Sequence, residues 1–270
     1  IASKQFVELC VKYTDIVTKL NAAIQGIKPL TAAIEKLLDG KAKRTLTPMH
    51  ADLLQLCLLS GCYHKGDQII RSFPVYEVEP KVTHLKEVDF LRYWYYCGNA
   101  YVGLKNFPKA IECYRLAIAT PASSLSAVVV ESYKKMVLIS LIETGEMPVL
   151  PPYTSNPVSR ALKGVTKTYQ TLGQLFTDNN REGLEEEMNK SFDEFDGDNN
   201  MGLAKQLLEA LTSRRIQRLT HTYITLSLTD IAQNVGLAGP AEAEARLVRM
   251  IDKGRIFARI DQTTGMVRFE

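Results

Sequence analysis

Histidine and cysteine are the residues of this sequence that could bind a metal ion, and their spacing matches no common metal site. The histidines never form His-x-His or His-Glu-x-x-His, the spacings that bring two imidazoles to one ion. Cys57, Cys62 and His64 are close in sequence, but positions five apart on a helix do not share a face, and no second ligand pair follows. We therefore expect no metal and interpret the thiols as buried packing residues. The residues concerned are His50, His64, His84, His221, Cys10, Cys57, Cys62, Cys97 and Cys113.

An acidic stretch, residues 196–200, resembles the start of a calcium-binding loop. Such a loop needs glycine at its sixth position and glutamate at its twelfth, where this sequence has Met201 and Leu207. We therefore expect no calcium here and interpret the stretch as a loop that caps the helix beginning at Leu203.

Two further catalytic patterns are incomplete. Gly98 and Gly103 have the spacing of a phosphate-binding Walker loop, but Leu104 and Lys105 follow where Lys and then Ser or Thr are required. The Gly-x-Ser-x-Gly turn of serine hydrolases does not occur in the sequence. The sequence thus predicts no catalytic residue and no cofactor, and we expect a protein that is not an enzyme.

The composition is that of a chain with a full core and little charge bias. Hydrophobic residues make up 46% of the 270, and the net charge of +3 is too small to argue for nucleic acid by itself. The longest apolar runs, such as residues 136–142, fall far short of the ~20 residues that span a membrane. The odd number of cysteines favours reduced thiols in the cytosol or nucleus. Because Ile1 is not an initiator residue, we expect the natural N-terminus to lie upstream.

The last quarter of the sequence has the element order of a winged helix. Ser227 can cap a short helix that ends near Gly236, and Pro240 fits the first turn of the next helix. Gly254 can end that helix, and Gly265 suits the turn between two strands. The expected elements are a helix over 203–219, a β-prone run over 223–226, helices over 228–236 and 240–253, and strands over 255–261 and 266–269.

The preceding part of the chain predicts helices throughout. No strand is expected before Thr222, and four prolines make residues 147–157 extended. Stacked antiparallel helix pairs of this kind predict a mainly α fold, in which a helical repeat (an α-solenoid) leads into the winged helix. Apolar residues with a helical period predict helices over residues 1–26, 29–40, 47–59, 85–104, 107–119, 123–144, 159–164, 166–177 and 181–195.

One helix pair carries a repeat signature. Gly98 and Ala110 are small, so two helices can approach closely, and Tyr101 and Tyr114 are expected to fill the gaps beside them. Because Cys97 stands where the repeat has leucine, and other pairs match loosely, we describe the repeat as tetratricopeptide-like. We expect its aromatic residues to belong to the core. The residues that match the tetratricopeptide spacing are Trp94, Gly98, Tyr101, Ala110, Tyr114 and Ala117.

A helical repeat that runs into a winged helix resembles the PCI domain, which is shared by the proteasome lid, the constitutive photomorphogenesis-nine (COP) signalosome and translation initiation factor three. Within that family the chain is similar to the signalosome subunit 3 family in short words spread along its length. Family members continue into a C-terminal helix that joins a shared helical bundle, and this sequence ends at Glu270, before that helix. The words are Ile24-Gln25-Gly26-Ile27, Leu56-Cys57-Leu58-Leu59, Gly103-Leu104-Lys105-Asn106-Phe107, Glu131-Ser132-Tyr133-Lys134-Lys135, Asp198-Asn199-Asn200-Met201-Gly202-Leu203, Ile216-Gln217-Arg218-Leu219-Thr220, Leu226-Ser227-Leu228 and Asp230-Ile231-Ala232.

The resemblance implies a non-catalytic scaffold subunit of the complex that removes a ubiquitin-like modifier from cullins and so regulates cullin-RING ubiquitin ligases. It implies a hetero-oligomer in cytoplasm and nucleus, with subunits 1 and 8 of the signalosome held through the winged helix. We expect N-terminal helical repeats over residues 1–106 and a PCI domain over 107–270, divided into helical repeats (107–202) and the winged helix (203–270). The alternatives are a subunit of another PCI complex, namely the proteasome lid or translation initiation factor three, and a winged-helix adaptor that binds nucleic acid.

The third helix of the winged helix weighs against nucleic acid. A helix that enters the major groove needs surplus Arg and Lys and residues such as Asn or Gln that read bases. Here the acidic residues Glu242, Glu244 and Asp252 offset the basic residues Arg246, Arg249 and Lys253. Other basic residues of the module are interpreted as solvated surface or as a contact to an acidic neighbouring subunit. They are Arg214, Arg215, Arg218, Arg255, Arg259 and Arg268.

The edges of the small sheet are the candidate protein-interaction site. Ile256, Ala258 and Ile260 alternate with Phe257 and Arg259, so the aliphatic set should face the core and Phe257 should point outward. Open edges invite another strand, although a segment that follows the wing could equally cover Phe257. The residues assigned to the site are Tyr223, Ile224, Thr225, Leu226, Phe257, Arg259, Met266 and Arg268.

Overall fold

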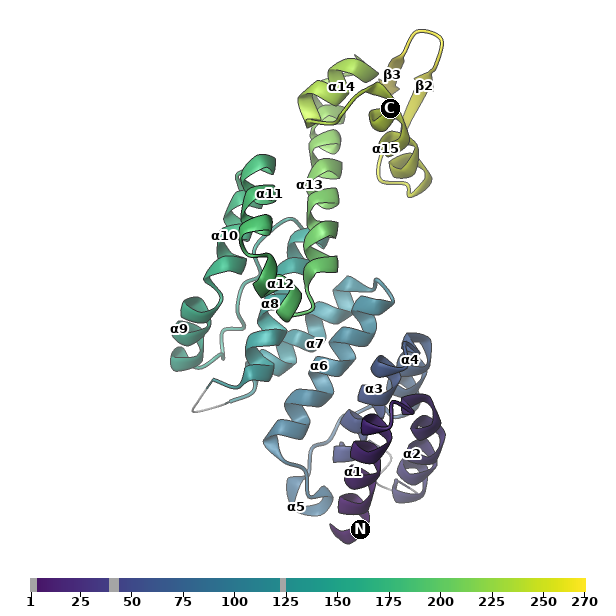
Figure 1. Ribbon diagram of the computed structural model, residues 1–270, viewed down its shortest axis with the longest axis vertical. Helices are drawn as coiled ribbons and strands as arrows, with labels where there is room; N and C mark the ends of the chain where they lie inside the picture. The colour runs from purple at the N-terminus through teal and green to yellow at the C-terminus, as the bar shows by residue number, and fades with distance from the viewer. Residues whose placement is uncertain (1–3, 39–43, 122–124) are drawn as a thin grey trace. The chain divides into compact units, whose positions relative to one another are not determined.

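The computed structural model describes residues 4–38, 44–121 and 125–270 and is mainly helical (Figure 1). The chain divides into two compact units, Ile1–Gln170 and Thr171–Glu270. The predicted helix boundaries at residues 1, 40 and 123 lie outside the described residues. None of the described helices combines the length and the apolar character that crossing a membrane requires.

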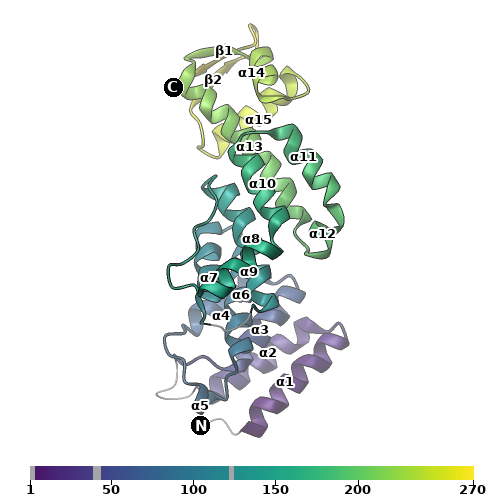
Figure 2. The same cartoon turned by 90° about the vertical axis from the view of Figure 1, so that its left-hand side faces the viewer.

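The first unit is built from helices that pack side by side (Figure 2). Helix α6 packs against α3 and α7, and α7 packs in turn against α8, which is the arrangement expected of stacked helical repeats. Thr45 and Glu77 form an isolated β-bridge, and the described part of this unit has no strand. The helices are α1 (Lys4–Lys19), α2 (Ala23–Leu37), α3 (Pro48–Leu59), α4 (Tyr63–Ser72), α5 (Pro80–Thr83), α6 (Glu87–Gly103), α7 (Phe107–Ala119), α8 (Ala127–Glu143) and α9 (Asn156–Val165), and α10 (Lys167–Thr177) continues the chain into the second unit.

The tetratricopeptide-like packing of α6 on α7 is confirmed, with one correction. Ala110 and Tyr114 are 0% exposed and Tyr101 is 7% exposed, as expected of core residues. Tyr114 lies over Gly98 and donates a hydrogen bond to Asn99 Oδ1 at 2.6 Å. Trp94 was expected in the same core but is only half-buried. Its ring meets Phe90 and Tyr93 edge to face, with centroids 6.2 and 5.1 Å away.

The structure corrects the predicted start of the second helix. The helix predicted over residues 1–26 ends at Lys19, because Asn21 adopts a left-handed backbone (φ 52°) that Asn tolerates better than most residues. Helix α2 begins at Ala23, and Pro29, which was expected to open it, lies inside it. Proline at this position removes one helical hydrogen bond. The burial of Ile27 and Leu30 on either side of it shows that tertiary packing outweighs that cost.

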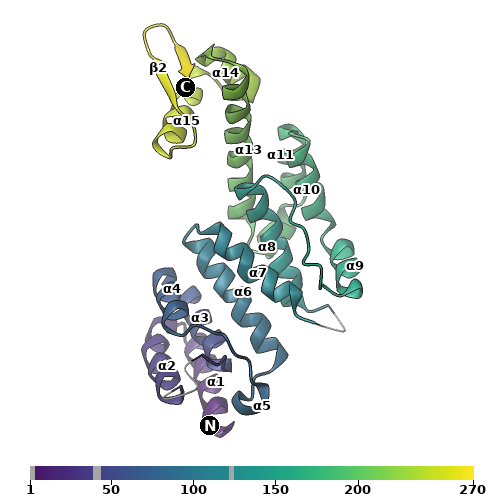
Figure 3. The ribbon, with the colours of Figure 1, turned by 180° about the vertical axis from the view of Figure 1, so that it is seen from behind.

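The second unit contains two short helices, a long helix and the winged helix (Figure 3). The helix predicted over residues 181–195 is interrupted at Ser191 and forms two helices. The order of the remaining elements is the one the sequence predicts, and the strand over 266–269 has its predicted bounds. The elements are α11 (Arg181–Lys190), α12 (Phe192–Gly197), α13 (Met201–Thr222), β1 (Thr225–Ser227), α14 (Leu228–Val235), α15 (Pro240–Asp252), β2 (Ala258–Asp261) and β3 (Met266–Phe269).

Local signals in the winged helix are confirmed at each predicted turn. The Asp230 amide donates to Ser227 Oγ at 3.0 Å, so Ser227 caps α14. Gly236, Gly254 and Gly265 all have positive φ, between 63° and 78°, which is the conformation that favours glycine at the end of a helix or in a tight turn. The core beneath the sheet is formed by residues from α13, α14, α15 and the strands, namely Ile216, Ile231, Val235, Leu247, Met250, Val267 and Phe269.

Candidate protein-docking surface

The three-stranded sheet of the winged helix has an inner face on the core and an outer face in solvent. The strand order is β1-β3-β2 and both pairings are antiparallel. Leu226, Val267 and Ile260 lie opposite one another across the three strands and face the core. The next row, Thr225, Arg268 and Arg259, lies on the outer face because side chains alternate along a strand.

The open edge of β2 is the part of the sheet best suited to receive another strand. The Glu270 amide donates to the Phe257 carbonyl at 2.9 Å, so Phe257 and every second residue after it hydrogen-bond toward β3. The backbone N–H and C=O groups of Ala258 and Ile260 therefore point to the opposite side, where no strand of the described residues lies beside β2. Strand β1 forms the other edge of the sheet, as the sequence predicts.

The phase predicted for the wing is confirmed. Phe257 is 69% exposed on the outer side of the strand, while Ile256 is 5% exposed and Ala258 and Ile260 pack against the core. Before β1, Tyr223 and Ile224 are 42% and 75% exposed. Two aromatic side chains and one aliphatic side chain are thus exposed to solvent beside the two edge strands of the sheet, a feature typical of contact surfaces.

Two of the predicted site residues do not lie on an edge strand, and a third faces inward. Met266 and Arg268 belong to β3, which is the central strand, and so contribute to the outer face. Leu226 faces the core and is half-buried. The physical reason is that β3 inserts between β1 and the strand that precedes it in the chain. An alternating pattern identifies the outward residues, but it does not give the order of the strands.

Charged side chains on the outer face form both a like-charged pair and an ion pair. Arg259 and Arg268 lie directly opposite each other on β2 and β3. Arg259 Nε lies 2.7 Å from Glu270 Oε1, an ion pair that the sequence analysis did not identify. At the turn between the strands Asp261 accepts hydrogen bonds from the Thr263 hydroxyl, from the Thr264 hydroxyl at 2.7 Å and from the Thr263 backbone amide at 3.0 Å, and these bonds lower its pKa to about 2.

The charges of α15 are engaged within the winged helix and its supporting helices. Arg246 Nη1 lies 3.9 Å from Glu209 Oε1 of α13, and Glu244 accepts a hydrogen bond from the side-chain amide of Gln262 at 2.6 Å. Glu242 accepts from the Ala238 amide at 2.9 Å, just before the helix. The helix that would enter a DNA groove therefore carries no net positive charge, and its charged side chains are partly engaged within its own fold.

Two arginines attach α14 to the helices before it. Arg215 of α13 donates to the Val235 carbonyl at 3.0 Å and to Asn179 Oδ1 at 3.0 Å. Arg181 of α11 donates to the Gly236 carbonyl at 2.5 Å. Both carbonyls belong to the C-terminal end of α14, where cations are favoured. The pKa of Arg215 is lowered by burial and by the nearby charge of Arg181.

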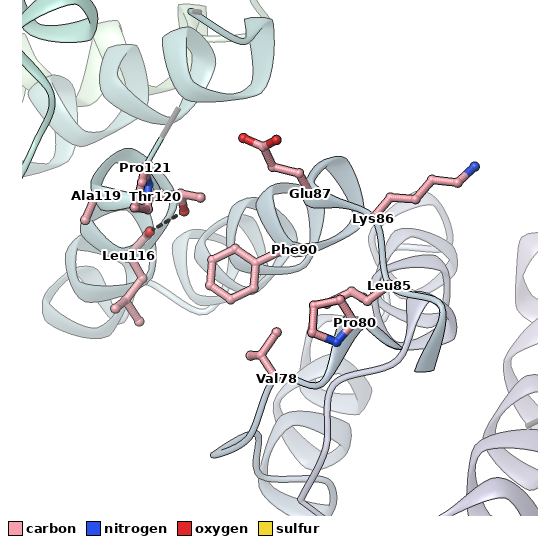
Figure 4. A pocket seen from close by; sticks show the side chains of 10 residues that line it. All are labelled: Val78, Pro80, Leu85, Lys86, Glu87, Phe90, Leu116, Ala119, Thr120 and Pro121. Atoms are coloured by element: carbon pink, nitrogen blue, oxygen red, sulfur yellow. Dashed lines mark hydrogen bonds between the residues drawn. The ribbon is translucent and has the colours of Figure 1, made fainter. Parts of the chain in front are cut away.

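An apolar hollow in the first unit is a separate candidate surface (Figure 4). Its volume is about 490 Å³, and Phe90 lies at its centre between Leu116 and Val78. The charged residues Lys86 and Glu87 extend away from Phe90. The lining therefore lacks converging polar groups that would orient a small ligand. Among the described residues no group of three or more His, Cys, Asp or Glu side chains is placed to hold a metal ion.

Helical repeats that lead into a winged helix with an exposed, two-edged sheet define a protein of the PCI class, and comparison with known families agrees. Residues 181–270 match the PCI domain, and residues 1–158 match the family "COP9 signalosome complex subunit 3, N-terminal helical repeats". The chain belongs to the COP9 signalosome subunit 3 family.

Two relatives extend the similarity over the whole chain. The chain is 37% identical over 270 residues to "COP9 signalosome complex subunit 3" of Dictyostelium discoideum, and covers 100% of itself and 64% of that protein. It is 39% identical over 270 residues to the protein of the same name from Arabidopsis thaliana, with 100% of this chain and 61% of that protein covered. The chain thus spans less than two thirds of the length of either relative.

Proposed function

We propose that this protein is a non-catalytic scaffold subunit of the COP9 signalosome, the complex that removes a ubiquitin-like modifier from cullins and so regulates cullin-RING ubiquitin ligases. The observation that carries the proposal is the full-chain similarity to two proteins named subunit 3 of that complex. The resemblance points to subunits 1 and 8 as neighbours, and to the cytoplasm and nucleus as the location.

In this proposal the winged helix holds the neighbours and the helical repeat forms an arm. A sheet with an open edge on either side can contact two neighbours in a row, since backbone pairing at an edge needs no particular side chain. The side chains beside the edge then select the partner. Phe257 is the principal anchor, because an exposed aromatic ring next to an open edge can be buried by an incoming strand.

The test uses full-length protein co-expressed with the remaining signalosome subunits. Phe257→Asp should weaken capture of the neighbours by ~2 kcal/mol or more, which is the size of effect seen at interface anchors. Its thermal melt should stay unchanged, since the side chain is exposed in the isolated fold. The matched control is Val248→Asp, which introduces the same residue on α15 at an apolar position that is 43% exposed, and it should leave capture intact.

Two results would refute the proposal. Normal capture by Phe257→Asp would exclude the wing as the docking site. Co-purification of the unaltered protein with subunits of the proteasome lid or of translation initiation factor three, in place of signalosome subunits, would assign it to another PCI complex.

A further inference from the structure

The outward side chains of β2 and of the residue just before it form a short pattern that an added strand would contact. Phe257, Arg259 and Asp261 lie on the same face, two positions apart. An added strand would pair with the free backbone groups of Ala258 and Ile260. It would then place one of its own side chains next to each of the three outward residues, at ~5 Å between Cβ atoms. The chemistry of these residues therefore limits which strands can pair with β2.

Arg259 has the strongest preference for an oppositely charged side chain on the added strand, because the residue opposite it within the sheet has the same charge. Arg268 lies directly opposite it on β3, and like charges directly opposite each other are unfavourable. The side chain of Arg259 is 83% exposed, and its partner Glu270 is 50% exposed. Within the part of the chain that the structure describes, no ion pair is found for Arg268. A carboxylate on a strand added to β2 would lie beside Arg259, with Arg268 one strand further away.

Asp261 has no comparable preference for a basic residue on the added strand. Its carboxylate accepts hydrogen bonds from the Thr263 amide, the Thr263 hydroxyl and the Thr264 hydroxyl in its own turn. These bonds stabilise the charge locally. Phe257, in contrast, has its ring exposed and gains from any apolar side chain beside it. The pattern thus has two informative positions, one apolar and one that prefers a carboxylate.

We propose that the strand that docks on the open edge of β2 carries an Asp or Glu facing Arg259 and an apolar residue two positions away facing Phe257. This inference rests on the proposed docking role of the winged helix and adds the chemistry that selects the partner. A second copy of this chain fits poorly, because Arg259 would face either Arg259 of that copy or Asp261, whose carboxylate is already bonded within its own turn. Nucleic acid is disfavoured because α15 carries no net positive charge.

The experiment compares charge variants of the full-length protein, with the co-expressed remaining signalosome subunits as the probe. Arg259→Glu should reduce the apparent affinity for the captured neighbour at least about tenfold, since it replaces attraction by repulsion. Arg259→Lys keeps the charge and should lose no more than about threefold. The loss in Arg259→Glu should shrink as KCl is raised from about 0.05 to about 0.5 M, because salt screens exposed charges.

Arg249→Glu is the matched control, because it makes the same change in net charge at an exposed position of α15. It should leave capture unchanged, and all three variants should keep the melting temperature of the unaltered protein. Phe257→Asp separates this inference from the proposed function. If Phe257→Asp abolishes capture while Arg259→Glu captures normally, the carboxylate is refuted and the docking role stands. If neither variant weakens capture, both are refuted. Salt-sensitive binding of random duplex DNA that Arg259→Glu abolishes would replace the acidic strand with nucleic acid and would also overturn the inference.

Discussion

Tyr114 occupies the space that Gly98 leaves free by having no side chain. A Cβ added at Gly98 would lie 2.7 Å from Tyr114 Cζ and 2.8 Å from Cδ1, closer than real Cβ atoms approach. Tyr114 cannot move away easily, since it is 0% exposed and its hydroxyl is bonded to Asn99. The contact between α6 and α7 therefore depends on the absence of one methyl group.

Gly98→Ala should lower the free energy of unfolding by ~1–3 kcal/mol, the usual cost of forcing extra volume into a packed core. Gly103→Ala is the matched control on the same helix. Its added Cβ would meet Tyr63, at 2.7 Å from Cγ, but Tyr63 is 37% exposed and can rotate into solvent. Urea denaturation of both variants checks the prediction. Equal stability losses would mean that Tyr114 is as free to move as Tyr63.

The same helix pair predicts a ranking of its aromatic residues. Tyr114→Ala should cost ~3–5 kcal/mol, as expected for a fully buried aromatic ring. Trp94→Ala should cost less, because Trp94 is half-buried and its enclosed indole N–H finds no hydrogen-bond partner in the part of the chain that the structure describes. Its removal therefore relieves one unfavourable group. Thermal melts of the two variants decide the order, and a larger loss for Trp94→Ala would show that Trp94 is the centre of the pair.

Two buried titratable groups in α3 have opposite effects on stability as pH changes. Burial lowers the pKa of His50 from 6.5 to about 4, and burial raises the pKa of Asp52 from 3.8 to about 6 even though Arg92 Nη2 lies 3.1 Å from Asp52 Oδ1. Burial outweighs the ion pair because Asp52 Oδ2 has no hydrogen-bond partner among the described residues. Above pH 4 the unfolded chain loses the Asp52 proton while the folded chain retains it, so this group makes stability fall toward pH 6.

His50 acts in the other direction. Between about pH 4 and pH 6.5 the unfolded chain binds a proton at His50 and the folded chain does not, so stability rises with pH. Asp52→Asn should remove the falling contribution. Its unfolding free energy should therefore rise more steeply than that of the unaltered protein between about pH 4 and pH 6 in urea titrations. Asp252→Asn, at an exposed position of α15, should leave the slope unchanged. A parallel pair of curves for Asp52→Asn would show that Asp52 is ionised throughout.

Features that depend on local chemistry could be predicted from the sequence. Ser227, Gly254 and Gly265 gave the ends of elements because caps and left-handed turns need these residue types. Alternation in the wing gave the outward position of Phe257 for the same local reason. Features set by distant residues could not be predicted. The central place of β3 depends on its pairing with β1, and Pro29 lies inside α2 because packing outweighs a poor local fit.

Arg215 shows this limit most clearly, since its partners lie 20 and 36 positions away in the sequence. In the sequence it was one of several basic residues read as surface or as a contact to a neighbouring subunit. In the structure its guanidinium joins three segments, because it donates to Asn179 and to the Val235 carbonyl at the end of α14. The carbonyls at the end of a helix lack helical partners, so the arginine supplies donors that the sequence next to α14 does not.

Replacing Arg215 by Met should keep most of its packing and remove these hydrogen bonds. We expect a loss of ~1–2 kcal/mol in the free energy of unfolding, near the lower end for bonds to a charged group because the side chain is partly exposed. Arg215→Lys should recover only part of the loss, since one ammonium group cannot span Asn179 and Val235 as the planar guanidinium does. Hydrogen exchange should become faster at the end of α14, around residues 235–237, and stay unchanged in α6. Arg249→Met, at an exposed position of α15, serves as control. Wild-type exchange at the end of α14 in Arg215→Met would show that Arg181, which donates to the Gly236 carbonyl, is sufficient to hold it.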